Sequence, residues 1–289
     1  MAGPTDTRDP SGWPASALRL ASALQERTRF TTLAGGVPAL LAHPDWRSRR
    51  PLVLWMHGRT SRKEIDSGRY LRYVRAGIAA CAIDLPGHGD RYDASCQQPE
   101  GTLGMLERAR GEVDGVLAEL LGGEHAGMFD ADRLAIGGMS AGGMVALRRL
   151  CEPHRFRCAA VEATTGCLET LYFPPEDQPR RWPTLHDRDR VRVVDPRAHL
   201  GGFEPLPLLA MHSEADAIVP FESQAGFVRD LRTHYEARSA AASLVEFVHW
   251  SETGADSEHM GFGRHAHEAK LRHVEFLVGH LDAASGAEA

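Results

Sequence analysis

The sequence has few cysteines and contains no long apolar run. Its five cysteines are an odd number and include no Cys-x-x-Cys pair, which suits buried thiols in a reducing compartment better than disulfides. No apolar run of about 18 residues occurs, and the opening MAGPTDTRDPSGWP lacks the basic and apolar regions of a signal peptide. These absences lead us to expect a cytoplasmic protein without a membrane segment.

An excess of positive charge is also missing. Lys and Arg number 33 against 39 Asp and Glu, and the resulting net charge of −6 argues against a nucleic-acid-binding surface. Hydrophobic residues make up 43% and charged residues 25%, as in ordinary globular proteins. We therefore predict a single domain over residues 1–289 that acts on a small molecule, with no nucleic-acid or membrane partner. A homodimer is left open.

Short apolar segments alternate with helical patterns along the chain. Two of these segments flank Gly35-Gly36, which predicts a hairpin, and the later ones lack polar alternation, which is typical of strands buried on both faces. The pattern predicts an α/β fold with a mostly parallel central sheet of about eight strands, covered by helices on both faces. The expected strands lie within residues 27–33, 37–44, 51–58, 77–87, 132–138, 157–164, 205–212 and 243–250, and the clearest helices within 15–25, 103–121 and 266–281.

One segment interrupts this alternation after the sixth strand. Residues 165–198 carry several prolines, aromatics and arginines. We interpret the segment as an excursion outside the core that forms a lid or substrate wall, and a plain surface loop is the alternative.

Gly138-Met139-Ser140-Ala141-Gly142 fits the pattern Gly-x-Ser-x-Gly between a predicted strand and a predicted helix. In that setting the pattern predicts a nucleophile elbow, a tight turn that projects the serine hydroxyl above the sheet. Glycines are needed because side chains there would collide with the neighbouring strand and helix. The alternative is a glycine-rich turn made for close packing alone.

A serine hydroxyl needs a base and an orienting carboxylate before it becomes a good nucleophile. Asp216 lies in the loop after the strand at 205–212, and Glu214 and Asp256 are weaker candidates. His259 lies after the last strand and before the closing helix. The order Ser, Asp, His leaves room for a crossover unit each time, so these three residues are our predicted catalytic triad.

An oxyanion hole would complete such a site. We expect the backbone N–H of Ala141 to supply one donor and that of Arg59, in the loop after the strand at 51–58, to supply the other. Ser61 and Glu64 read as a capping box that starts the next helix and holds this loop. His57 is expected to support the loop and to take no part in catalysis.

Other polar clusters receive structural interpretations. His88 and Arg91, in DLPGHGDR, are interpreted as loop anchors. The histidines at 259, 265 and 267 do not converge on a helix, and no His-Glu-x-x-His motif is present, so we predict no metal site and no cofactor.

At these motifs the chain resembles the α/β-hydrolases, and within them the bacterial dienelactone-hydrolase-like serine esterases. The matching stretches, from about Arg27 onward, are HGRTSRKE, DLPGHGDR, GGMSAGG, HSEADAIVP and the histidine loop with EHMG. The resemblance implies hydrolysis of carboxylic esters by the triad and oxyanion donors named above. Dienelactone hydrolases use cysteine where this chain has Ser140, and Ser213 stands where relatives commonly carry glycine.

The sequence thus predicts a serine esterase that works through an acyl-enzyme. A peptidase or thioesterase with the same machinery is the first alternative, and a catalytically silent module that binds an acyl ligand is the second. Arg59, Met139 and Trp182 are candidate substrate-binding residues. If Arg180 and Arg181 join Arg59, a carboxylate or phosphate on the substrate would suit the site, and the alternative is that these arginines face water.

Overall fold

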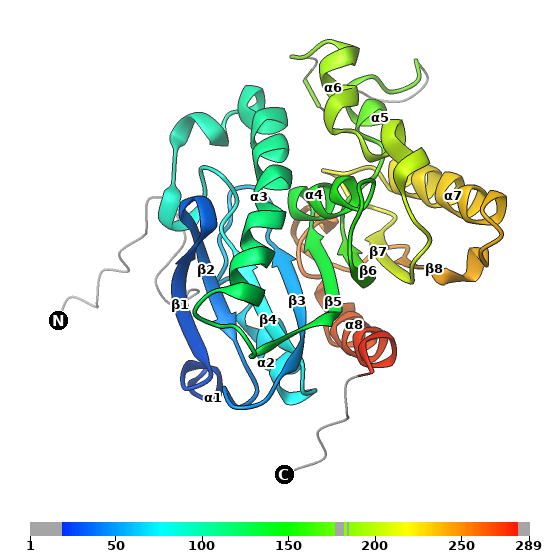
Figure 1. Cartoon of the computed structure of the whole chain (residues 1–289). Helices are drawn as coiled ribbons and strands as arrows, with labels where there is room; N and C mark the ends of the chain where they lie inside the picture. Colours follow the sequence, from blue (N-terminus) through cyan, green and yellow to red (C-terminus); the bar gives the residue numbers. More distant parts are fainter. Residues whose placement is uncertain (1–18, 177–181, 184, 283–289) are drawn as a thin grey trace.

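The computed structural model describes residues 19–176, 182–183 and 185–282. Its centre is an eight-stranded sheet in the order β1-β2-β4-β3-β5-β6-β7-β8 (Figure 1). β1 and β2 pair antiparallel, β2 pairs antiparallel with β4, and every later pairing is parallel. The predicted α/β-hydrolase fold, with about eight mostly parallel strands, is confirmed. The strands are β1 (Thr28–Leu33), β2 (Val37–Ala42), β3 (Arg50–Met56), β4 (Ala79–Ile83), β5 (Phe129–Met139), β6 (Phe156–Glu162), β7 (Leu208–Ser213) and β8 (Val245–Trp250).

Helices cover both faces of the sheet. One apolar cluster joins the strands to α3, α4 and α7, and a second joins them to α1, α2 and α8. The α-helices are α1 (Ser22–Gln25), α2 (Ser67–Arg75), α3 (Thr102–Gly122), α4 (Ala141–Arg149), α5 (Leu168–Tyr172), α6 (Arg188–Val194), α7 (Phe221–Ala237) and α8 (Ala266–Leu281). Short 3-10 segments lie at 34–36, 89–91, 94–97, 99–101, 196–202, 242–244, 256–258 and 263–265. No described helix has the length and apolarity needed to cross a membrane.

The central strands are buried on both faces, as their unbroken apolar sequences predict. In β3, Leu54 and Met56 pack in the first cluster, while Val53 and Trp55 pack in the second. Successive side chains of a strand point to opposite faces, so each strand contributes to both cores. Because the strands are buried, the positions of their carboxyl ends are fixed. The loops that follow these ends hold the candidate site.

Two expectations about individual segments need correction. The first predicted helix, 15–25, is a single turn in its described part, because residues 19–21 are not helical and 15–18 lie outside the described residues. The segment 165–198 is not wholly outside the core, since Leu168 and Val191 are fully buried in the first cluster. α5 and α6 stand beyond the carboxyl end of the sheet beside α7 (Figure 1). A lid or wall role for them remains a prediction.

Candidate active site

Ser140 sits at the turn between β5 and α4, with φ 53° and ψ −118°. This backbone conformation is strained for a residue with a side chain. A Cβ on Gly142 would lie 2.1 Å from the carbonyl oxygen of Met56, and one on Gly138 would lie 2.4 Å from the carbonyl carbon of Gly142. Only glycine fits at either position, so the local geometry is that of a nucleophile elbow.

The structure brings Ser140, His259 and Asp216 into one hydrogen-bonded chain. Nδ1 of His259 lies 2.7 Å from Oδ2 of Asp216, and Nε2 lies 3.0 Å from Oγ of Ser140. With Nδ1 donating to the carboxylate, Nε2 is free to accept the serine proton. Asp216 is buried, and its Oδ1 accepts the amides of Ile218 and Val219 at 2.7 and 2.8 Å. The carboxylate is therefore held in a single orientation.

The loop that carries His259 is organised by Glu258, which the sequence analysis did not single out. Its Oε2 accepts the hydroxyls of Ser213 and Thr253, each at 2.7 Å, and its Oε1 accepts the amide of Gly254 at 2.5 Å. Burial alone would raise the pKa of Glu258, but these hydrogen bonds outweigh burial and lower the pKa to about 2. Ser213 thus links the end of β7 to the histidine loop.

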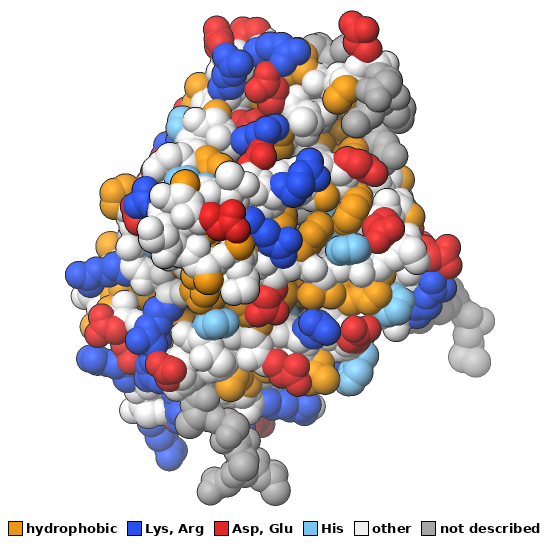
Figure 2. Space-filling model, turned by 90° about the vertical axis from the view of Figure 1, so that its right-hand side faces the viewer, with side chains coloured by type: hydrophobic (Ala, Val, Ile, Leu, Met, Phe, Trp, Pro, Cys, Tyr) orange, Lys and Arg blue, Asp and Glu red, His pale blue; other side chains and the backbone are white. Residues whose placement is uncertain are grey.

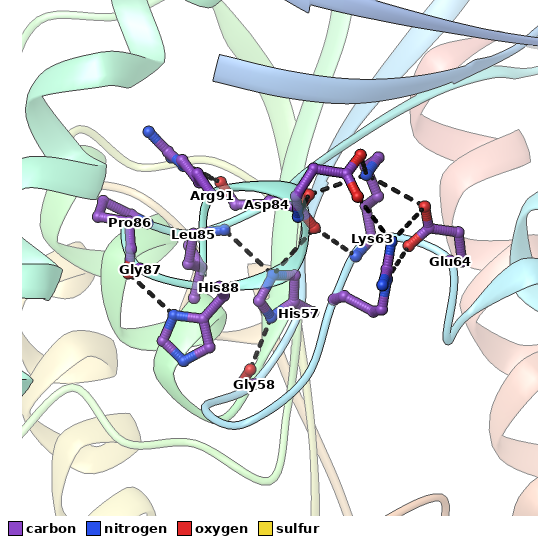
Figure 3. A network of polar contacts seen from close by, with 12 residues as sticks. His57, Gly58, Lys63, Glu64, Asp84, Leu85, Pro86, Gly87, His88 and Arg91 are labelled. Atoms are coloured by element: carbon purple, nitrogen blue, oxygen red, sulfur yellow. Dashed lines mark hydrogen bonds and ion pairs between the residues drawn. The ribbon is translucent and has the colours of Figure 1, made fainter. Parts of the chain in front are cut away.

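His57 supports the loop that contains Arg59, as expected. Its Nε2 accepts the amide of Leu85 at 3.0 Å, and its Nδ1 donates to the carbonyl of Gly58 at 2.6 Å (Figure 3). Burial lowers the pKa of His57 to about 3, so the ring is neutral. A Cβ on Gly58 would lie 3.3 Å from Cβ of Ser140, which places this loop directly against the serine.

The expected capping box is wrong. α2 begins at Ser67, and its N-cap, Asp66, makes no capping hydrogen bond. Lys63 is buried and instead enters an ion cluster, in which its Nζ lies 2.8 Å from the buried Asp84 and 2.6 Å from the exposed Asp90 and its amide donates to Asp84 at 2.9 Å (Figure 3). The loop is therefore fastened to the end of β4, and no helix cap holds it.

The serine opens on a cavity of about 770 Å³. Arg59, Met139 and Trp182 all line it, which leaves their substrate-binding role a prediction, and Nε1 of Trp182 donates to the carbonyl of Ile218 at 2.8 Å. Arg180 and Arg181 lie outside the described residues. On the face in Figure 2, hydrophobic side chains gather in the middle, between basic and acidic ones. The described wall of the cavity, likewise, combines apolar and charged side chains.

A buried ion pair forms part of the same wall. Both terminal nitrogens of Arg69 bind the carboxylate of Glu162 at 2.6 Å, and Nδ1 of His273 lies 2.9 Å from the same carboxylate. Burial opposes the charge on Glu162, but Arg69 and His273 hold its pKa at about 2. The backbone carbonyl of Glu162 accepts the Ser140 amide at 2.9 Å. The sequence signals only one member of this pair, since Glu162 is a carboxylate at the end of an otherwise apolar buried strand.

The remaining sequence candidates lie elsewhere or play other parts. Glu214 pairs with His249 at 2.7 Å on the surface. Asp256 lines the cavity but contacts His259 through its backbone carbonyl. Arg91 binds the carbonyl of Asp84 and a carboxylate on α3, which makes it a loop anchor. Within the described ranges, no group of three His, Cys, Asp or Glu residues is arranged to hold a metal ion.

The profile of the prolyl oligopeptidase family matches residues 116–283, which is more than half of the chain and includes all three residues of the hydrogen-bonded chain. The chain belongs to the prolyl oligopeptidase family. It is a serine hydrolase of the esterase and peptidase type. Esterase YjfP of Escherichia coli is 28% identical over 196 residues, which cover 64% of this chain and 76% of the esterase.

Solved structures of low sequence identity share the fold of this serine hydrolase. TT1662 of Thermus thermophilus superposes with a TM-score of 0.67 at 23% identity, covering 89% of this chain and 99% of the other. A puromycin-hydrolyzing peptidase of Mycobacterium tuberculosis gives 0.65 at 18% identity, covering 88% of this chain but only 40% of the peptidase. At these identities the likeness establishes the α/β-hydrolase fold.

Proposed function

We propose that the protein hydrolyses carboxylic esters, with Ser140 as nucleophile, His259 as general base and acid, and Asp216 as the group that orients the imidazole. His259 takes the hydroxyl proton as Oγ attacks the ester carbonyl, then gives that proton to the departing alcohol. In the second half-reaction His259 takes a proton from water as the water attacks the acyl-enzyme, then returns that proton to Ser140 as the carboxylic acid is released. Asp216 stabilises the imidazolium that forms in each half-reaction.

The observation that carries this proposal is the unbroken hydrogen-bonded chain from Ser140 through His259 to Asp216, at 3.0 and 2.7 Å. Ala141 is the first residue of α4, where amides have no partner within the helix, and Arg59 follows the glycine packed against Ser140. We infer that their N–H groups form the oxyanion hole. The similarity to an esterase supports an ester over other acyl substrates.

Active-site labelling tests the mechanism. A fluorophosphonate should label Ser140, and p-nitrophenyl acetate or butyrate should give a burst of p-nitrophenol followed by steady turnover. Ser140→Ala should remove both signals while the protein stays folded. A folded wild-type protein that is neither labelled nor active on esters from acetate to palmitate would refute the proposal.

A peptidase is the second candidate, because the family and several structural neighbours are peptidases. The triad specifies acyl transfer but does not determine which leaving group the substrate carries. Comparison of matched aminoacyl p-nitrophenyl esters, thioesters and p-nitroanilides would separate the candidates. We expect kcat/KM to be highest for the ester, and a p-nitroanilide that exceeds its matched ester would favour the peptidase.

A further inference from the structure

Arg59 is a cation in the cavity wall that pairs with no carboxylate of the described residues. Its Nη2 donates to the backbone carbonyls of Gln97 and Gln98, at 2.7 and 3.2 Å. No Asp or Glu of the described chain lies within ion-pair distance of it, and its Nε is buried without an acceptor. Two neutral carbonyls hold the guanidinium in place but leave its positive charge uncompensated.

The other arginine of the cavity wall is balanced differently. Arg69 is buried and forms a two-point pair with Glu162, so its charge is neutralised within the protein. An unpaired charge taken out of water carries a large desolvation cost, and proteins normally offset that cost with a counter-ion. Arg59, by contrast, is half-buried and has no carboxylate partner among the described residues, so its charge is available to an anionic group that enters the cavity.

Within the described part of the chain, the groups that hold Arg59 are neutral and are themselves fixed in place. Tyr172, Cys96 and His88 are described residues that act on it electrostatically, and burial lowers the pKa of Arg59 without removing a charge that arginine keeps in proteins. Gln97, which accepts from Arg59, is itself tied to the carbonyl of Gly87 through Nε2 at 2.6 Å. The cationic group is thus preorganised one residue beyond the glycine packed against Ser140.

We infer that Arg59 binds a carboxylate on the substrate, so that the substrate class is an ester with an anionic group on one side of the scissile carbonyl. This inference rests on the proposed hydrolase function. Charge-assisted hydrogen bonds of this kind change affinity by about 10- to 100-fold.

Two pairs of substrates test the inference, one pair for each side of the scissile carbonyl. Mono(4-nitrophenyl) adipate and its methyl ester differ in charge on the acyl side, and 4-acetoxybenzoate and its methyl ester differ on the leaving-group side. We expect kcat/KM for the anionic member to exceed that for the neutral member by about 10-fold or more in at least one pair. The excess should shrink as ionic strength rises.

Variants then assign the preference to a residue. Arg59→Met should lower the anionic-to-neutral ratio by about 10- to 100-fold, and Arg59→Lys should restore part of it. Lys270→Met is the matched control, since Lys270 is also a cation of the cavity wall without an ion-pair partner among the described residues, but it lies on α8 and not in the loop packed against Ser140. The control should leave the ratio within about twofold of wild type.

Equal ratios in wild type and Arg59→Met, or a loss that follows Lys270→Met, would overturn the inference. Failure of the hydrolase proposal gives a result distinct from these two, because no ester would be hydrolysed and the fluorophosphonate would not label Ser140. Calorimetric titration with monomethyl adipate decides the inference in that case. Weaker binding to Arg59→Met than to wild type supports it, and equal or absent binding refutes it.

Discussion

Gly142 should be irreplaceable, and the structure gives the size of the effect. In Gly142→Ala the new Cβ would lie 2.1 Å from the carbonyl oxygen of Met56 and 2.7 Å from that of His57. Carbon and oxygen need about 3.4 Å, so α4 must retreat from β3 by about 1 Å. Both obstacles are backbone atoms at the end of a buried strand, so neither can rotate away. We expect about 1–3 kcal/mol of lost stability.

The same displacement should cost more in activity than in stability. Ser140 precedes α4 directly, and a shift of about 1 Å at a reacting group can lower turnover by about 100-fold. Gly104→Ala, in α3, is the matched control, because its Cβ would meet nothing within 4 Å. It should raise stability by about 0.5–1 kcal/mol. Urea unfolding and ester turnover measure both effects, and a Gly142→Ala variant as stable and active as wild type would refute the reasoning.

Three further predictions concern charge. Asp216→Asn should lower kcat by about 10⁴-fold with little change in KM, because it favours the wrong imidazole tautomer, and a loss below about 10-fold would contradict the assigned role. Glu258→Gln should lower kcat by about 10-fold through the histidine loop, whereas Glu252→Gln, a surface control, should not. Because the folded-state pKa of His57 is about 3, its contribution to stability is present above pH 6.5 and is lost as pH falls toward 3. Urea unfolding measures the free energy of unfolding at pH 7.5 and at pH 5. The difference between these two values should be about 2 kcal/mol smaller for His57→Gln than for wild type.

The sheet and the position of the candidate site could be predicted because their signals are local. Each buried strand is a short apolar run, and in parallel sheets polar residues that follow such runs gather at one edge. That rule predicts Asp216 and His259, the Gly-x-Ser-x-Gly pattern predicts Ser140, and the structure holds all three at hydrogen-bond distance. Gly138 and Gly142 were expected from the elbow geometry, which dictates residue size directly.

The supporting polar network could not be predicted because its partners are far apart in the sequence. Ser61 and Glu64 have the spacing of a capping box, yet the residue between them that fastens the loop is Lys63, which pairs with Asp84 just after β4. Arg69 and Glu162 are 93 residues apart, and neither sequence segment indicates that the two residues pair. A tertiary ion pair overrides local helix signals when burial makes an unpaired charge costly.

The end of β3 is the common support of the serine and of the loop opposite it. The Met56 carbonyl limits the approach of Gly142, and Gly58 packs against Ser140 while the His57 ring fastens the loop to Leu85. Because both halves of the candidate site rest on one strand end, a rigid shift of β3 would move them together and preserve their spacing. Substitutions that bend the loop relative to the strand should therefore lower turnover more than substitutions that shift the whole strand. That arrangement accounts for the ion cluster at Lys63, which restrains the loop at its far end.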